Sequence, residues 1–326
     1  MTRDIDTQLT KYLTDAHSIE EQALAQLRTA PDIAGTPELA DAFRRHLAET
    51  EGHEQTVRSL LEARDASPSL LKDTMMKLGG KGFLLFAKLN PDTPGKLLSH
   101  ALSYEALEQG AYELLHAVAE RAGDDEVALA ATRIRNEERA MLERLEDLVE
   151  ISANASLRDL QPDDLQEQLT KYLADAHALE EQAIQLLEKG PSLVGGGELG
   201  RAMEDHLVET REHAEIIEAR LRAHDSSPNR LKDAAMRLGA LNWGMFFGAH
   251  PDTPGKLAAF AYAFEHLEVA GYEQLRIVAE KAGDQETVAA VTGILDQERT
   301  AARTLERLFP EAAARSLEAV GVESAS

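Results

Sequence analysis

The sequence predicts an all-α protein made of two tandem four-helix bundles. The composition favours helices, because Ala, Leu and Glu dominate and only 5% of the 326 residues are aromatic. Long stretches with a helical apolar period alternate with short stretches rich in Pro and Gly. The second half of the chain also repeats the first, so each half is expected to form one bundle.

The repeat keeps one register throughout. TKYLTDAHSIEEQA, which begins at Thr10, returns as TKYLADAHALEEQA from Thr170, and HLAETEGH from His46 returns as HLVETREH from His206. Both pairs lie 160 residues apart, and the other matches keep this offset, so the duplication contains no gap. We therefore divide the chain into copy 1, residues 1–152, and copy 2, residues 153–326, joined by a linker over about 151–164.

Four long helices are expected in each copy. In copy 1 they run from about Ile5 to Leu27, from about Pro37 to just before Asp65, from after PDTPG to Gly123, and from Asp124 to about Glu150. The glycine at 123 is a typical helix-stop residue because it adopts a positive φ without strain.

A long connection separates the second helix from the third. It spans roughly 25–30 residues, more than ordinary bundle loops, and holds the broken apolar helix LLKDTMMKLGGKGFLLFAKL. Two short turns and one long crossover define the ferritin-like four-helix topology. We expect the two bundles to pack as an intramolecular pseudo-dimer. Whether the chain also assembles into a homo-oligomer is left open.

Composition also excludes several kinds of site. The chain has no cysteine, which excludes disulfides, zinc–thiolate sites, iron–sulfur clusters and cysteine nucleophiles and suits a reducing cytosol. Its formal net charge of −24 repels nucleic acid and anionic lipid but attracts cations. The start has no apolar signal region, and the apolar stretches are too short to cross a membrane. We expect a soluble, cytoplasmic protein without nucleic-acid or membrane partners.

Carboxylates and histidines recur at equivalent positions of the two copies. Only six of the eleven histidines have a partner in the other copy, and all six lie on the helices that carry recurring glutamates. The predicted metal ligands are Glu20, Glu49, His53, Glu105, Glu108 and Glu138 in copy 1, and Glu180, Glu209, His213, Glu265, Glu268 and Glu298 in copy 2. Carboxylates from four helices would repel one another inside a bundle, and divalent cations would offset that cost.

Several neighbouring residues have plainer interpretations. Glu21 is expected to be solvated, and His17 to be a satisfied core or interface histidine. His46 could equally well hydrogen-bond a metal ligand or be an ordinary polar residue. Tyr112 is expected to pack rather than to carry a radical. GGKG is not a phosphate loop, because no strand precedes it and no Ser or Thr follows the lysine.

The motifs DAHSIEEQ, AFRRHLAETEGH, YEALEQGAYELL and RNEERA together resemble the YciE/YciF group of ferritin-like proteins. The second copy is closer in its third helix, where FEHLEVAGYEQL resembles that group's Glu-His-x-Glu-x-Ala-x-Tyr run. The resemblance covers nearly all of each copy. It implies a metal-binding bundle, often linked to stress responses, whose ligands here are Glu20, Glu49, Glu105, Glu108 and Glu138, or Glu180, Glu209, Glu265, Glu268 and Glu298.

The ligand pattern departs from the usual di-iron motif in two ways. His53 follows Glu49 by four residues rather than three, and the fourth helix has no histidine after Glu138. Carboxylate and imidazole ligands favour iron or manganese over zinc, and one or two ions per site stay open. Three functions remain: a di-metal oxidase, ferroxidase or peroxide scavenger; a non-enzymatic metal-sequestering protein; and a metal-free helical scaffold or partner-binding protein.

Overall fold

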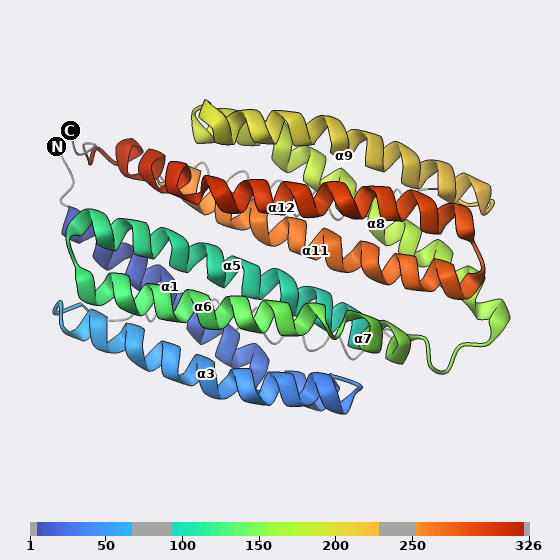
Figure 1. Cartoon of the computed structure of the whole chain (residues 1–326), viewed down its shortest axis with the longest axis horizontal. Helices are drawn as coiled ribbons and strands as arrows, with labels where there is room; N and C mark the ends of the chain where they lie inside the picture. The colour runs from blue at the N-terminus through green and yellow to red at the C-terminus, as the bar shows by residue number, and fades with distance from the viewer. Residues whose placement is uncertain (1–4, 67–92, 228–251, 323–326) are drawn as a thin grey trace. The chain divides into compact units, whose positions relative to one another are not determined.

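The computed structural model describes residues 5–66, 93–227 and 252–322 (Figure 1). The described residues form helices and no strand, which confirms the predicted all-α class. The chain divides into two compact units. Unit 1 comprises Met1–Ser156 and Leu317–Ser326, and unit 2 comprises Leu157–Ser316.

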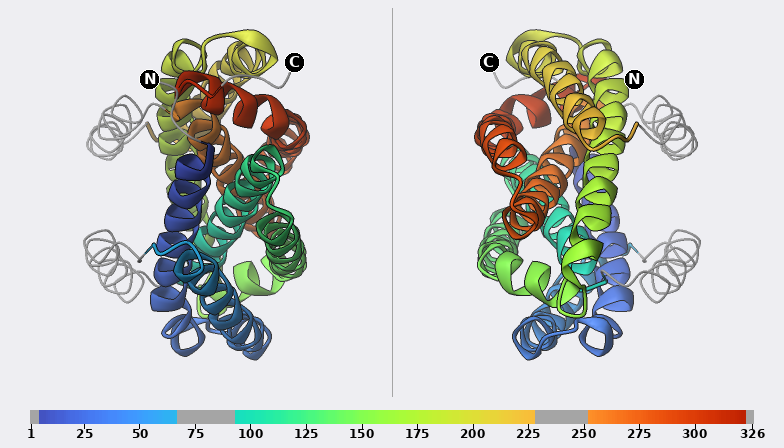
Figure 2. Two further views of the ribbon diagram at one scale, coloured as in Figure 1. Left: turned by 90° about the vertical axis from the view of Figure 1, so that its left-hand side faces the viewer. Right: turned by 90° about the vertical axis from the view of Figure 1, so that its right-hand side faces the viewer.

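In the part of unit 1 that the structure describes, four long helices dominate. Its helices are α1 (Ile5–Leu27), α2 (Ala30–Ile33), α3 (Pro37–Glu62), α5 (Thr93–Ala122), α6 (Asp125–Glu146) and α7 (Val149–Ser156). α1 contacts α3 and α5, and α6 contacts the same two helices. The long helices therefore form a four-helix bundle in which α3 and α5 lie at opposite corners (Figure 2).

The helices α3 and α5 run in the same direction. Arg64, which follows α3, hydrogen-bonds Asp124, which caps α6 directly after α5. At the other end Gly35, just before α3, faces Pro94 in the first turn of α5. The end of α3 and the start of α5 therefore lie at opposite ends of the bundle, as the predicted crossover requires. The short helix expected within residues 70–89 lies outside the described residues.

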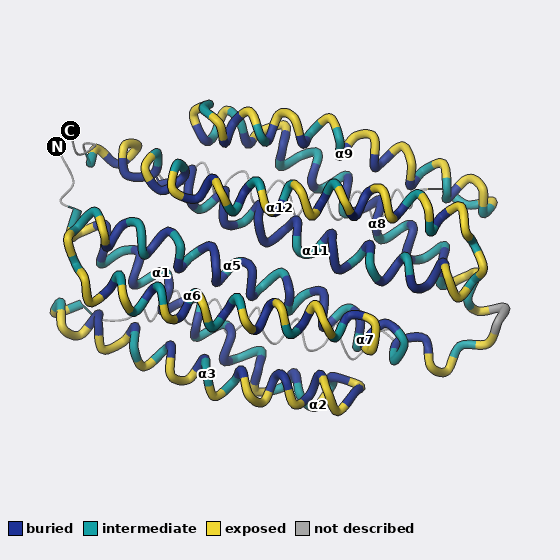
Figure 3. The backbone as a smooth tube through the Cα atoms, viewed as in Figure 1, coloured by how far each residue is buried: buried dark blue, intermediate teal, exposed yellow. Residues whose placement is uncertain are grey.

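A heptad-like stripe on each long helix of unit 1 builds the core. On α3 the buried residues Leu39, Phe43, His46, Thr50, His53, Val57 and Leu60 follow one another at steps of three and four. On α6 the buried stripe is Val127, Ala131, Ile134, Glu138, Met141 and Leu145. Figure 3 shows such faces as a dark-blue side opposite a yellow one. Polar site residues thus occupy core positions with apolar residues on either side.

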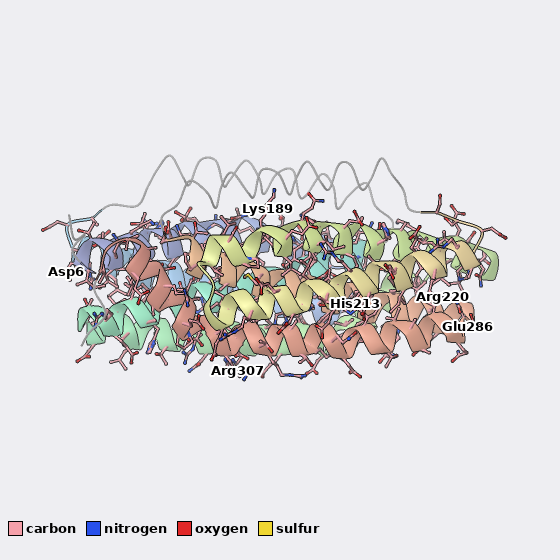
Figure 4. The ribbon with its side chains drawn as sticks, turned by 90° about the horizontal axis from the view of Figure 1, so that it is seen from above. Asp6, Lys189, His213, Arg220, Glu286 and Arg307 are labelled. Atoms are coloured by element: carbon pink, nitrogen blue, oxygen red, sulfur yellow. The ribbon has the colours of Figure 1, made fainter. Side chains whose placement is uncertain are left out.

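Unit 2 repeats the bundle with α8 (Pro162–Val194), α9 (Gly197–Ala223), α11 (Thr253–Ala282) and the part of α12 (Gln285–Ala319) that ends at Ser316. α8 contacts α9 and α11. Arg220 of α9 pairs with Glu286 of α12 at 2.6 Å, and both are labelled in Figure 4. The rings of Tyr262 and Phe309 join α11 to α12, with centroids 5.5 Å apart.

Most predicted helix ends agree with the structure. Gly123 and Gly283 have φ of 70° and 76° and end the preceding helices as expected. The fourth helix of copy 1 differs, because it is interrupted after Glu146 and resumes as α7, whereas α12 is continuous. Among the described residues, no helix is both long and apolar enough to cross a membrane.

Two glycines of unit 1 should respond to alanine in opposite directions. Gly35 has φ of 73°, and an added Cβ would lie 2.4 Å from Pro94 Cγ. Gly35→Ala is therefore expected to destabilise the chain by about 2 kcal/mol. Gly52 lies within α3 with nothing within 4 Å of an added Cβ, so Gly52→Ala should stabilise by up to about 1 kcal/mol. Chemical unfolding followed by circular dichroism measures both changes.

The comparison tests the turn before α3 directly. Both substitutions add the same methyl group, so their difference reports backbone conformation and local space. An unfolding midpoint of Gly35→Ala equal to or above that of Gly52→Ala would contradict the packing of Gly35 against Pro94.

Candidate metal centre

The core stripe of α3 brings two histidines into the centre of unit 1. His46 and His53 are seven residues apart, two helical turns, and are 0% and 1% exposed. Their rings lie edge to face with centroids 6.4 Å apart. Buried imidazoles need polar partners, and the inward-facing nitrogens of both rings find theirs on the other helices.

Those partners are glutamates at core positions of the other three long helices. They are Glu20 of α1, Glu105 and Glu108 of α5, and Glu138 of α6, and none is more than 3% exposed. The structure thus brings together five of the six ligands predicted for copy 1. It places His46, whose role the sequence left open, in the same cluster.

One half of the cluster surrounds His46. The potential ligand atoms of His46, Glu105, Glu108 and Glu138 all lie within 4.8 Å of one another. His46 Nε2 is 2.9 Å from Glu105 Oε2 and 3.3 Å from Glu138 Oε2. This half offers three carboxylates and one imidazole to a single point.

The other half surrounds His53. Its members are Glu20, His53 and Glu138, whose ligand atoms again lie within 4.8 Å of one another. His53 Nδ1 is 2.8 Å from Glu138 Oε1 and 3.8 Å from Glu20 Oε1. Glu138 therefore belongs to both halves, and each of its two oxygens faces a different histidine.

Unit 2 repeats this geometry with equivalent residues. His206 Nε2 is 3.1 Å from Glu265 Oε2 and 3.4 Å from Glu298 Oε2. His213, labelled in Figure 4, has its Nδ1 2.8 Å from Glu298 Oε1 and 3.6 Å from Glu180 Oε1. Glu268 is buried like Glu108, but it does not belong to the close group of His206.

Glu49 lies beside the cluster rather than in it. The steps of the α3 stripe skip position 49, and the Glu49 side chain is 37% exposed. Its Oε2 is 3.1 Å from His46 Nδ1, on the outer side of that ring. Glu209 contacts His206 Nδ1 at the same distance and is 44% exposed. Position 46 thus occupies the place that the sequence analysis gave to position 49, and each cluster holds two imidazoles instead of one.

Carboxylates on the outer nitrogens orient the histidines. An ionised carboxylate can only accept a hydrogen bond, so His46 donates Nδ1–H to Glu49 and turns Nε2 inward. His53 donates Nε2–H to Glu137 Oε2 at 2.6 Å and turns Nδ1 inward. Both inner nitrogens therefore face the glutamates. Glu137 was not among the residues predicted from the sequence; its position next to Glu138 was the only available signal.

The inward-facing atoms lack hydrogen-bond partners among the described residues. In unit 1 these buried atoms are Glu20 Oε2, His46 Nε2, His53 Nδ1, Glu105 Oε2, both oxygens of Glu108 and both oxygens of Glu138. The same eight atoms recur in unit 2. Several of them face one another as histidine–carboxylate ion pairs, 2.8–3.4 Å apart. Buried polar atoms rarely stay unpaired, so this donor set fits a cation.

Burial and crowding shift the pKa values of the carboxyl groups. Burial, aided by the charge of Glu138, raises the pKa of Glu20 to about 8. Burial likewise raises the pKa of Glu105 to about 7 and that of Glu108 well above its usual range. For Glu138 burial acts in the same direction, but His46 and His53 outweigh it and hold its pKa well below the usual range. Glu180, Glu265, Glu268 and Glu298 show the same pattern.

The pKa values of these histidines shift in the opposite direction to those of isolated buried histidines. Burial alone would lower the pKa of His53, but its contacts with Glu138, Glu20 and Glu137 raise it to about 9. Burial is also outweighed at His46, whose pKa Glu105 and Glu138 raise. Each imidazolium therefore compensates part of the glutamate charge when only protons are available.

Tyr112 contributes a polar contact as well as packing. It is 1% exposed, and its hydroxyl donates a hydrogen bond to Glu20 Oε1. Tyr272 makes the same bond to Glu180 Oε1. The bond fixes one oxygen of the glutamate and leaves the other, Oε2, facing the cluster.

A separate group of possible ligands at the edge of unit 1 already includes a positively charged arginine side chain. The ligand atoms of His17, Glu21 and Glu54 also lie within 4.8 Å of one another. However, the Arg58 guanidinium pairs with Glu54 and lies 3.8 Å from Glu21. His17 bonds Glu54 Oε1 at 2.9 Å, so this group is an ion-pair network. Copy 2 has Ala214 in place of Glu54 and does not repeat it.

Comparison with known protein families places both copies in one family. Residues 4–158 and 164–318 each match the family described as "Domain of unknown function (DUF892)". No solved structure matches the chain. The double match confirms the tandem duplication, while the resemblance to the YciE/YciF group stays a prediction. Because the two matches cover most of the sequence, the chain belongs to the DUF892 family, with two copies of its domain in tandem.

Proposed function

We propose that each bundle binds a pair of divalent cations, iron or manganese, between its four long helices. One observation carries the proposal: two His/Glu groups in each bundle share a single glutamate, Glu138 or Glu298. A carboxylate whose two oxygens face two separate histidines is placed to bridge two ions.

The charges of the cluster support two ions rather than one. Ionised Glu20, Glu105, Glu108 and Glu138 carry four negative charges, which two divalent cations neutralise. Without cations, each buried carboxylate would lose hydration at a cost on the order of several kcal/mol. The metal set is then His46, Glu105, Glu108 and Glu138 for one ion, and Glu20, His53 and Glu138 for the other.

The ligand chemistry selects the metal class. Imidazole and carboxylate ligands without thiolate suit iron and manganese. Zinc can bind the same ligands, but we favour iron or manganese over it here. Iron or manganese would supply one-electron redox chemistry when bound. The chain's own residues hold and orient the ions: Glu49 and Glu137 align the imidazoles, and Tyr112 aligns Glu20. Protection against oxidative or general stress, by sequestering the ions or by reducing peroxide or dioxygen, is the role this site would serve.

A metal-free scaffold is the competing function, and the ion pairs favour it. His53 and Glu138 lie 2.8 Å apart, so the cluster compensates part of its own charge by protonation. Even so, this arrangement leaves both oxygens of Glu108 and both of Glu268 buried without a hydrogen-bond partner among the described residues. Metal binding accounts for the Glu108 oxygens, which belong to the close group of His46, and the scaffold does not.

The shared glutamate gives the sharpest test by substitution. Glu138→Gln keeps the shape of the side chain but removes the bridging charge, so unit 1 should lose both ions. After dialysis against Fe²⁺ without oxygen, or against Mn²⁺, the metal content should fall from about four ions per chain to about two. Metal analysis of the dialysed protein measures it. Combining Glu138→Gln with Glu298→Gln should abolish uptake.

Glu143→Gln is the matched control, because Glu143 is an exposed carboxylate of the same helix. It should leave uptake unchanged. A wild-type chain that takes up neither metal would refute the proposed function and favour the scaffold.

Metal removal should destabilise the fold more at high pH than at low pH. The pKa of Glu20 is raised from 4.5 to about 8 and that of His53 from 6.5 to about 9. The folded, metal-free chain therefore holds protons that the unfolded chain has released, and its stability falls as the pH rises through this window. Metal replaces those protons, so its stabilisation grows with pH, to about 4 kcal/mol at a thousandfold excess over Kd.

Melting temperatures with and without chelator check this expectation. The loss on chelation should be larger near pH 8 than near pH 5.5. The double variant Glu138→Gln, Glu298→Gln should show little dependence on chelator at either pH. A chelator effect of equal size at both pH values would contradict the exchange of protons for metal.

A further inference from the structure

The two centres share their proposed ligands but differ at the outer contact of one histidine. His53 Nε2 lies 2.6 Å from the carboxylate oxygen Oε2 of Glu137. The equivalent contact in unit 2 joins His213 Nε2 to the amide oxygen Oε1 of Gln297 at 2.9 Å. Positions 137 and 297 are 160 residues apart, so this is a substitution between the copies rather than a change of geometry.

The carboxylate fixes the proton of His53 on its outer nitrogen. Ionised Glu137 offers no hydrogen, so His53 Nε2 must donate. The inner nitrogen Nδ1, which faces Glu20 and Glu138, then keeps its lone pair for a cation once the ring is neutral. A charged acceptor also makes the imidazole more basic and a stronger ligand.

The amide does not impose this choice on His213. A carboxamide presents either an oxygen or an NH₂ group to its neighbour. With the oxygen inward, His213 binds metal through Nδ1 as His53 does. With the NH₂ inward, His213 Nε2 must accept, and the ring proton moves to Nδ1, which faces Glu180 and Glu298. That second tautomer cannot bind a cation at the centre.

The other half of each centre has the same partner in both units. His46 and His206 contact Glu49 and Glu209 at an identical 3.1 Å. Arg144 lies 4.0 Å from Glu49, and Thr304 replaces it in copy 2. This arginine is 33% exposed and acts on the His46 half, where solvent screens it. The strongest difference is therefore confined to the halves of His53 and His213.

We propose that Glu137 and Gln297 are positioning residues that make the two metal centres unequal. The inference rests on the proposed metal function. The half-site of Glu20, His53 and Glu138 binds a divalent cation more tightly than the half-site of Glu180, His213 and Glu298. Partners of metal-bound histidines typically change affinity 10–100-fold, and we expect about tenfold because the Glu137 side chain is 42% exposed.

An exchange of the two residues tests the proposal in the full chain. Protein stripped with chelator is titrated with Mn²⁺, and the free ion is followed by its electron paramagnetic resonance signal. Glu137→Gln should weaken one bound ion about tenfold, and Gln297→Glu should strengthen one about tenfold. The double exchange should restore the wild-type binding curve. A gain of affinity in Gln297→Glu is a result that a merely structural role would not produce.

The control again is Glu143→Gln, which removes an exposed charge from α6 and should leave every dissociation constant unchanged. If the wild-type chain binds Mn²⁺ and both single variants bind it with the same dissociation constants, this inference is overturned and the proposed function stays intact. A wild-type chain that binds no Mn²⁺ and no Fe²⁺ would overturn both.

Discussion

The buried charge at the centre of each bundle is the constraint on which the structure depends. Four carboxylates and two imidazoles of unit 1 occupy core positions among apolar side chains and are almost fully shielded from water. Such a cluster persists only if its charge is compensated, by protons on glutamate and histidine or by cations. Compensation in turn requires all four long helices to keep their register, because each one contributes a member. Stability and function of this fold are therefore expected to vary together.

The fold was largely predictable because its signals are local and repeated. Apolar period, helix-stop glycines and a gapless offset each constrain the same four helices, and two copies supply independent readings of one pattern. The break between α6 and α7 was not predicted, since the apolar period continues across it and α12 spans the equivalent positions without interruption. Helix existence follows from periodicity, whereas a local break depends on packing that periodicity does not report.

The site was predictable by residue type and less so by role. Sequence spacing put His46, Glu49 and His53 on one side of α3, but a spacing of three or four does not separate the middle of a stripe from its edge. Following the stripe from Leu39 to Leu60 does separate them, because positions 46, 50 and 53 fall on it and 49 does not. Glu137 gave no such signal: its contact with His53 joins α6 to α3 and exists only once the helices are packed.

The duplication within one chain has a genetic consequence. In an assembly of identical subunits, any substitution appears in every site at once. Here His53 contacts the carboxylate of Glu137 in one bundle, whereas the equivalent His213 contacts the amide of Gln297 in the other. The surrounding glutamates are the same in both bundles. Covalent linkage thus lets one cluster change while the other keeps its residues. A homodimer would have to keep its two clusters alike.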